Sequence, residues 1–127
     1  NPYSGKKNAL QLFTDVVEPL LSCAGVSFEK VETERPKHAI EIAKNLDVDK
    51  YSTIATISGD GLFHEMLQGF MQRKDWRKIL SIPLALLPAG SGNGLMKSFN
   101  TCGIYSGVFN LIKGYSIGLD MMVFTSA

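Results

Sequence analysis

The sequence predicts an α/β fold, in the form of an open, doubly wound and mostly parallel sheet with helices on both faces. Short apolar or β-branched runs alternate along the chain with longer stretches of helical periodicity, which is the pattern of βαβ units. Glycine-rich loops follow two of the strand-like runs directly, as they do where ligands bind at the edge of such sheets. The length of 127 residues corresponds to one domain.

Composition narrows the class of protein further. The chain has 45% hydrophobic residues, enough to build a core, and this excludes a disordered chain. Its 13 Lys and Arg nearly balance 12 Asp and Glu, so the clustered basic face typical of nucleic-acid binding is not expected. Apolar runs all fall well short of the ~20 residues that a membrane span requires.

The first predicted helix covers residues 8–24 and is followed by the first predicted strand. Five apolar residues of this helix share one stripe at helical spacing, and Gly25 is expected to end it. They are Leu10, Phe13, Val17, Leu20 and Leu21. Residues 26–33 alternate around Val26, Phe28 and Val31, which predicts a strand.

A second helix and a central strand come next. Pro36 suits a first helical turn, and the apolar spacing that follows predicts a helix as far as Leu46. Residues 53–57 are short and β-branched, as in a central strand. After the loop Ser58–Gly61, a helical stripe resumes with Leu62, Met66 and Phe70.

The last third of the chain predicts a strand at 83–87, a glycine-rich loop at 90–94, a helix over about 105–112 and a strand within 117–125. Met96 is expected in the core of a short helix. The opening residues have the character of a loop that follows a strand. We therefore expect this strand to precede Asn1, and the chain to be a truncated piece of a longer one.

Three glycine-bearing loops are predicted at the carboxyl ends of strands: residues 1–6, 58–61 and 90–94. Successive backbone N–H groups beside a helix N-terminus form a site for phosphate oxygens. A single loop could need glycine for its turn geometry alone, but three at one edge favour phosphate binding. Neither GxGxxG nor GxxxxGK[ST] occurs, which disfavours a Rossmann dehydrogenase and a P-loop NTPase.

Asp60 is the main candidate for chemistry. It either caps the helix that follows it or lies beside phosphates and accepts a hydroxyl proton during phosphoryl transfer; its two flanking glycines favour the second. Glu65 can face the same crevice or be an ordinary solvated glutamate. His64 is interpreted as a surface residue. Lys6 is either a cationic helper or a solvated lysine.

The cysteines are interpreted as two buried thiols. Cys23 and Cys102 lie far apart without CxxC spacing, which indicates a reducing compartment rather than a disulfide or a metal site. His38 and His64 are equally isolated, so no zinc cluster is expected.

Four segments together resemble the catalytic domain of lipid kinases, a superfamily that includes diacylglycerol, ceramide and sphingosine kinases. They are Asn1–Lys6, Thr33–Arg35, Ser58–Leu62 with Glu65, and Leu87–Gly94. The resemblance covers residues 1 to about 100. Sphingosine kinases match best in detail, because of Ser58, the stretch 33–39 and Asp75-Trp76 before the strand at 83–87.

The resemblance implies that residues 1–127 are the ATP-binding N-terminal portion of such a domain, with a fold like that of lipid kinases and NAD kinases. Asp60 would deprotonate the primary hydroxyl of a lipid. Ser58, Gly59, Asp60 and Gly61 would border the lipid head group. Mg²⁺ would be held through the phosphates, without protein ligands. Residues expected to contact ATP are Asn1, Pro2, Tyr3, Thr33, Glu34, Arg35, Pro36, Glu65, Gly90, Ser91 and Gly92.

In this family a second, β-rich domain carries most of the lipid pocket, so the chain would hold half of an active site. Sphingosine is the expected lipid, and diacylglycerol or ceramide is the alternative. An NAD-kinase-like enzyme is less favoured, because the opening Asn1–Lys6 suits lipid kinases better. A non-catalytic nucleotide-binding module stays open as a different class. A cytoplasmic protein with transient membrane contact is expected, since the substrate is a lipid.

Overall fold

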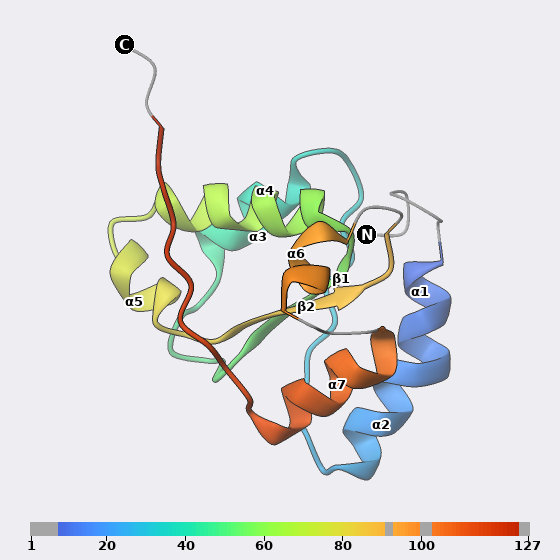
Figure 1. The fold of residues 1–127 in the computed structure, drawn as a ribbon. Helices are drawn as coiled ribbons and strands as arrows, with labels where there is room; N and C mark the ends of the chain where they lie inside the picture. The colour runs from blue at the N-terminus through green and yellow to red at the C-terminus, as the bar shows by residue number, and fades with distance from the viewer. Residues whose placement is uncertain (1–7, 91–92, 100–102, 125–127) are drawn as a thin grey trace.

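A computed structural model of the chain describes residues 8–90, 93–99 and 103–124. In this part, two parallel strands lie between two groups of helices (Figure 1). Strand β1 (Ile54–Ser58) pairs with β2 (Leu84–Pro88), and the register runs from Ile54 opposite Leu84 to Ser58 opposite Pro88. The strands are joined through helices, as a parallel pair requires.

Three helices cover one face of the strand pair: α3 (His38–Asn45), α4 (Asp60–Met71) and α5 (Trp76–Leu80). Ala43, Phe70 and Ile79 are fully buried between them, and Ile54 and Leu84 of the strands pack against this cluster. The short helix α6 (Gly94–Ser98) packs beside α4, where Phe63, Leu86 and Met96 form a second buried group.

The other face is covered by the N-terminal helical segments and by α7 (Ile104–Lys113). The N-terminal segments are α1 (Ala9–Leu12), one stretch of π-helix η1 (Phe13–Val17) and α2 (Glu18–Cys23). Their core side chains meet Leu87 of β2 and Val108 of α7, with Ile57 of β1 partly buried against them. Apolar side chains on both faces give the strands the continuous apolar character seen in the sequence.

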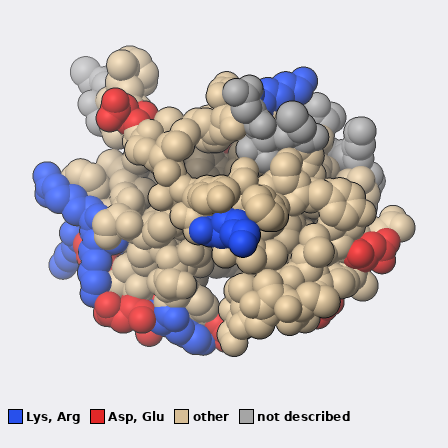
Figure 2. All heavy atoms as spheres, turned by 60° about the horizontal axis from the view of Figure 1, so that its bottom comes forward, with Lys and Arg blue, Asp and Glu red and all other residues tan. Residues whose placement is uncertain are grey.

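In the face that Figure 2 brings forward, charged side chains of both signs lie toward the edges, and one basic group lies near the middle. The surface around this basic group is otherwise largely uncharged. Within the described residues, no helix combines the length and the apolar character needed to cross a bilayer.

The structure confirms a mixed α/β fold with a small parallel sheet and helices. The predicted strands at 53–57 and 83–87 are present and displaced by one residue. The helices predicted at 8–24, 36–46, after Asp60 and near 105–112 are also present, although Pro36 lies in the turn before α3. Met96 is buried in α6, as predicted.

Two predicted strands are absent from the described residues. Residues 26–33 run extended without a strand ladder, and so do 117–124; residue 125 lies outside the described part. Val31, predicted to alternate into a core, is 62% exposed, and Val26 and Phe28 are also exposed. Alternation shows that a segment can form a strand, but a ladder also needs a neighbouring backbone to bond with.

The predicted apolar stripe of the first helix is also partly wrong. Leu10 and Leu20 are exposed, whereas Ala9 and Val16 are buried. The π-helical stretch η1 precedes Pro19, which has no N–H to donate to the carbonyl four residues earlier. The wider π turn rotates the helix, so a stripe drawn at 3.6 residues per turn misplaces both ends.

Cys23 corrects the prediction of two buried thiols, because it is a free and exposed cysteine. It is the last residue of α2, beyond the buried Leu21 and just before Gly25. Gly25 has a φ of 69° and ends the helix as predicted. Cys102 lies outside the described residues.

We expect Gly69→Ala to destabilise the fold by about 1–3 kcal/mol. A Cβ at Gly69 would lie 2.5 Å from the carbonyl oxygen of Ile40 and 2.6 Å from the Cβ of Ala43, so it would push α3 and α4 apart. Gly61→Ala in the same helix is the matched control, since a Cβ there meets nothing within 4 Å. The free energy of unfolding in urea measures both variants. A Gly69→Ala protein as stable as Gly61→Ala would contradict the close packing.

Candidate active site

The parallel pairing of the strands brings two glycine loops together at one edge. The pairing continues past the strand ends, where the N–H of Ala89 donates to the carbonyl of Ser58 at 3.0 Å. One residue later, a Cβ on Gly90 would lie 2.5 Å from the Cα of Gly59. Backbone therefore lies directly on backbone, and only glycine fits at position 90. The expected convergence of the loops at 58–61 and 90–94 is confirmed for their described residues.

Asp60 links the two loops through its side chain. It is the first residue of α4, and its Oδ2 accepts hydrogen bonds from the N–H of Gly94 at 2.8 Å and of Leu95 at 3.4 Å. These are the first two residues of α6. Asp60 therefore caps α6 across space, and α4 has no side-chain cap bond of its own. The alternative that Asp60 caps the helix following it is not what the structure has.

The second carboxylate oxygen of Asp60 has a different environment. Oδ1 is buried and has no hydrogen-bond partner among the described residues. One oxygen thus holds the loops together, while the other has no partner in the described part of the chain. A buried carboxylate oxygen without a partner is costly, and such atoms often belong to sites where a ligand supplies the missing donor.

Asn93 is a site residue that the sequence interpretation missed. Its Nδ2 donates to the carbonyl of Gly90 at 2.8 Å, which closes the loop before α6. Its Oδ1 is buried and without a partner in the described part of the chain. The residue type could have indicated this role, because Asn side chains commonly hydrogen-bond to nearby backbone in glycine-rich turns.

Ser58 is almost completely buried at the end of β1. Its hydroxyl donates to the carbonyl of Gly59 at 2.7 Å. The side chain thus supports the turn that leads into Asp60, and Gly59 and Gly61 present backbone on either side of that carboxylate.

Residues 33–36 lie ahead of α3. Thr33 is buried, and its Oγ1 has no partner among the described residues. The N–H of Glu34 donates to Nδ1 of His38 at 3.1 Å. Arg35 donates two bonds to the carboxylate of Glu41, at 2.7 and 2.6 Å, and both side chains are exposed. Within the described chain, no hydrogen bond or ion pair joins these residues to Asp60.

Glu65 lies on α4, five residues after Asp60, and is half-buried. Its side chain makes no hydrogen bond or ion pair to another described residue. His64 is exposed and lies 3.0 Å from Gln68 through its Nε2, which confirms its interpretation as a surface residue. Asn1, Pro2, Tyr3, Lys6, Ser91 and Gly92 were also predicted candidates, and they lie outside the described residues.

The described residues contain no group of three or more His, Cys, Asp or Glu side chains placed to hold a metal ion. The described site instead holds one carboxylate, whose Oδ2 accepts from the N–H groups of Gly94 and Leu95 and whose Oδ1 has no partner among the described residues, and the buried oxygens of Thr33 and Asn93. This arrangement can accept one proton at Asp60, and the glycines of the two loops leave the backbone open to a ligand.

Comparison with known proteins gives a consistent match. The family model of the diacylglycerol kinase catalytic domain matches residues 1–123. Sphingosine kinase 1 of Arabidopsis thaliana is 38% identical over 126 residues, which is 95% of this chain and 26% of the relative. Sphingosine kinase 1 of Homo sapiens is 44% identical over 110 residues, 87% of this chain and 29% of the relative.

A fission-yeast protein agrees with these two. Sphingoid long chain base kinase 4 of Schizosaccharomyces pombe is 38% identical over 127 residues, which is 98% of this chain and 27% of the relative. The chain thus spans about a quarter of the length of the curated relatives it matches.

The Arg35–Glu41 pair generates a prediction about pH. Hydrogen bonds from Arg35 hold the pKa of the Glu41 carboxyl below its ordinary value, which is about 4.3. A carboxyl whose pKa is lowered by folding stabilises the fold above its ordinary pKa, and this contribution is lost as pH falls through the lowered pKa. We expect Arg35→Ala to raise the pKa of the Glu41 carboxyl toward its ordinary value, because the bonds from Arg35 are the largest cause of its lowering. Titration of its side-chain carboxyl by NMR measures this.

Arg77→Ala is the matched control for that titration. Arg77 is also exposed, but it lies over the ring of Trp76 and pairs with no carboxylate in the described chain. Its removal should leave the pKa of Glu41 unchanged. A Glu41 pKa that is equally low in Arg35→Ala would show that the bonds from Arg35 are not the cause.

Proposed function

Because this chain belongs to the diacylglycerol kinase catalytic domain family, we propose that it is the ATP-binding part of a lipid kinase that phosphorylates the primary hydroxyl of a sphingoid base. The observation that supports the chemistry is the Asp60 carboxylate: backbone N–H groups hold one oxygen, and the other has no partner among the described residues. The choice of lipid is supported by the names of the relatives, which are sphingosine or sphingoid-base kinases.

Asp60 acts as the general base in this proposal. Its Oδ2 is held by the amides of Gly94 and Leu95, so the orientation of the carboxylate is set before the lipid binds. Oδ1 accepts the proton of the lipid hydroxyl. The hydroxyl oxygen forms its bond to the γ-phosphorus as the bond from that phosphorus to ADP breaks. A positioned base contributes about 10²–10⁴-fold to such a step.

The glycine backbone at this edge of the sheet supports nucleotide binding. We assign the ATP contacts to Asn1, Pro2, Tyr3, Thr33–Pro36, Glu65 and Gly90–Gly92, with the lipid head group at Ser58–Gly61. The buried, unpartnered Oγ1 of Thr33 and the backbone-on-backbone contact at Gly90 fit a phosphate cradle. ATP would supply the transferred phosphoryl group, and Mg²⁺ held through its phosphates would offset their charge.

The remaining proposals concern the longer protein. Residues 1–127 would form the nucleotide-binding portion of an open, doubly wound sheet, as helices on both faces of a parallel strand pair support. The protein would work in the cytoplasm with peripheral contact to membranes, because its substrate is a lipid. The alternatives, a diacylglycerol or ceramide kinase or a nucleotide-binding regulatory module, are separated by the experiment below.

We expect the longer protein, given Mg²⁺ and γ-labelled ATP, to transfer label to sphingosine and not to diacylglycerol or ceramide. Asp60→Asn should lower kcat by about 10²–10⁴-fold. Asn keeps a side-chain oxygen that can accept from the N–H of Gly94, so its stability should stay close to that of the parent. Asp60→Ala removes both the proposed base and the acceptor for the N–H of Gly94. The free energy of unfolding of this variant should therefore also fall by about 1 kcal/mol, as when a helix cap is lost.

Asp49→Asn is the matched control, because Asp49 is an exposed aspartate paired with Lys78 away from the two loops. Its activity should equal that of the parent. Label on a different lipid would keep the mechanism and overturn the substrate. Nucleotide binding without transfer to any lipid would favour the regulatory module, and full activity of Asp60→Asn would exclude Asp60 as the base.

A further inference from the structure

The turn at residues 34–37, which joins the stretch 26–33 to α3, is closed by His38. The N–H of Glu34 donates to Nδ1 of the His38 ring at 3.1 Å. The N–H of His38 in turn donates to the carbonyl of Arg35 at 3.2 Å. His38 is the first residue of α3, so its ring and its backbone both fasten the turn to the start of this helix. The proposed function leaves this residue without a role.

The backbone of this turn is strained at Lys37. This residue has a φ of 63° and a ψ of 4°, in the left-handed region, and it is the one non-glycine residue with a positive φ among those described. It precedes α3 without giving the helix a side-chain cap bond. A backbone of this kind persists only where the surrounding contacts over-determine it, and such strain gathers at ligand sites. The bond from Glu34 to His38 spans Lys37 and is one of the contacts that hold it.

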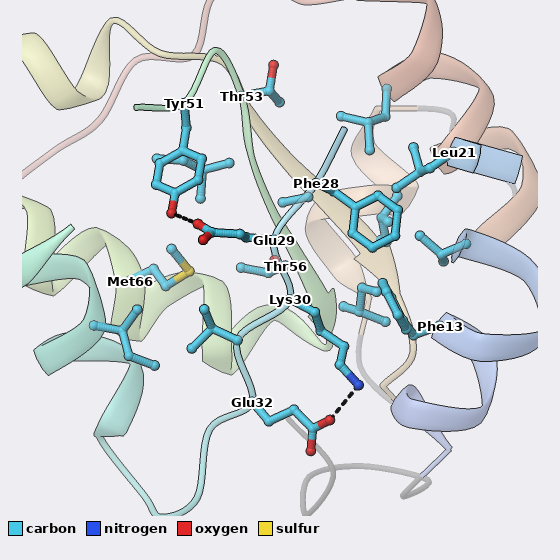
Figure 3. Close-up of a pocket in the computed structure, with 18 of the residues that line it drawn as sticks. Phe13, Leu21, Phe28, Glu29, Lys30, Glu32, Tyr51, Thr53, Thr56 and Met66 are labelled. Atoms are coloured by element: carbon cyan, nitrogen blue, oxygen red, sulfur yellow. Dashed lines mark hydrogen bonds and ion pairs between the residues drawn. The ribbon is translucent and has the colours of Figure 1, made fainter. Parts of the chain in front are cut away.

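The stretch that enters the turn is fixed by side chains. Residues 26–33 lie along a cavity beside the strands, and Figure 3 shows the ion pair between Lys30 and Glu32 in this stretch, at 2.7 Å. The stretch ends at Thr33, which is buried. The chain is thus held as far as Thr33, and the conformation of residues 34–37 depends on the contacts of the turn itself.

The ring of His38 can accept this bond in one protonation state only. A backbone N–H is always a donor, so Nδ1 must supply a lone pair, and the proton of the neutral ring is then on Nε2. In the imidazolium both ring nitrogens carry protons, and Nδ1 cannot accept from Glu34. Protonation therefore breaks the bond. It also places a cation at the N-terminus of α3, which the helix dipole disfavours.

The turn and the two neighbouring helices carry charged groups of both signs. Arg35 donates two hydrogen bonds to the carboxylate of Glu41, at 2.7 and 2.6 Å. Helix α4 packs against α3 where Gly69 meets Ile40. The charged and titratable residues of the turn, of the rest of α3 and of α4 are Glu34, Arg35, Lys37, Glu41, Lys44, Asp60, His64 and Glu65. All of these stay in place when only position 38 is changed, so variants at this position isolate the effect of the ring.

We propose that His38 is a positioning residue for ATP: its neutral ring holds the backbone of residues 33–36 in the conformation that binds the nucleotide, and its protonation weakens that binding. The inference rests on the proposed function, which assigns ATP contacts to these residues. Thr33, whose buried Oγ1 has no partner among the described residues, directly precedes the amide that the ring holds. His38 touches no reacting atom, so it should affect the binding of ATP and leave the transfer step unchanged.

The experiment measures the Kd of Mg·ATP for the longer protein by calorimetry at about pH 8 and about pH 6, between which a histidine changes charge. His38→Ala removes the acceptor and should raise the Kd at the higher pH by roughly 2–10-fold, as expected for one hydrogen bond. His38→Asn keeps an oxygen that can accept from Glu34 and does not titrate, so it should bind like the parent there. At the lower pH the Kd of the parent should rise more than that of His38→Asn, because any change in the charge of ATP is common to both.

His64→Ala is the matched control. His64 is the other histidine of the sequence, and its exposed ring lies 3.0 Å from Gln68 on the surface of α4. Its removal should change neither the Kd nor the pH dependence of the Kd. In the assay with sphingosine, His38→Ala should raise the KM for ATP and leave kcat and the KM for sphingosine unchanged.

Three results would overturn the role of His38: His38→Ala that binds ATP like the parent, His38→Asn that binds as weakly as His38→Ala, or equal pH dependence in the parent and His38→Asn. The last comparison decides the question even if His38→Ala fails to fold. A parent that binds Mg·ATP but phosphorylates no lipid would overturn the proposed kinase and leave this role intact. A parent that binds no ATP would overturn both.

Discussion

The parallel pairing of β1 with β2 is the constraint on which the candidate site depends. The register places Ser58 opposite Pro88, so both strands end at the same level and both chains turn there. At that level Gly59 and Gly90 touch through their backbones. Displacing the register by one residue would separate the loops and turn every strand side chain to the other helix layer. The apolar packing on both faces therefore also maintains the position of the site.

The side chain of Asp60 joins the two loops by hydrogen bonds. Its carboxylate takes the place of a local cap for α6, five residues long, and ties the start of that helix to the start of α4. Charge-assisted bonds to backbone amides are about twice as strong as neutral ones, and here they offset part of the cost of burying a carboxylate. The same residue thus orders the loops, while its Oδ1 has no hydrogen-bond partner among the described residues.

The extended segments have a common physical cause. Residues 26–33 and 117–124 have the composition of strands, but in the described chain neither has a backbone neighbour to pair with. Val31, Ile117 and Phe124 are exposed for this reason. Glu29 and Phe28 meanwhile hold the first segment at a distance from β1. A segment joins a sheet only if its sequence favours an extended backbone and a neighbouring strand is there to pair with it. The local sequence supplies only the first of these.

The sequence by itself determined the α/β class, the two central strands, most helices and the loops that carry glycine. These features follow from periodicity and turn chemistry, which act over a few residues. The resemblance in the motifs around Asp60 also identified the family from the sequence. Only the tertiary structure decided that Asp60 caps α6 instead of its own helix, that Asn93 closes the second loop, and that Leu10, Leu20 and Cys23 face outward. The first depends on a bond between residues 34 positions apart, and the second on where the amide of Asn93 points. The third involves a local irregularity, the π turn before Pro19. The spacing of apolar residues carries no record of any of them.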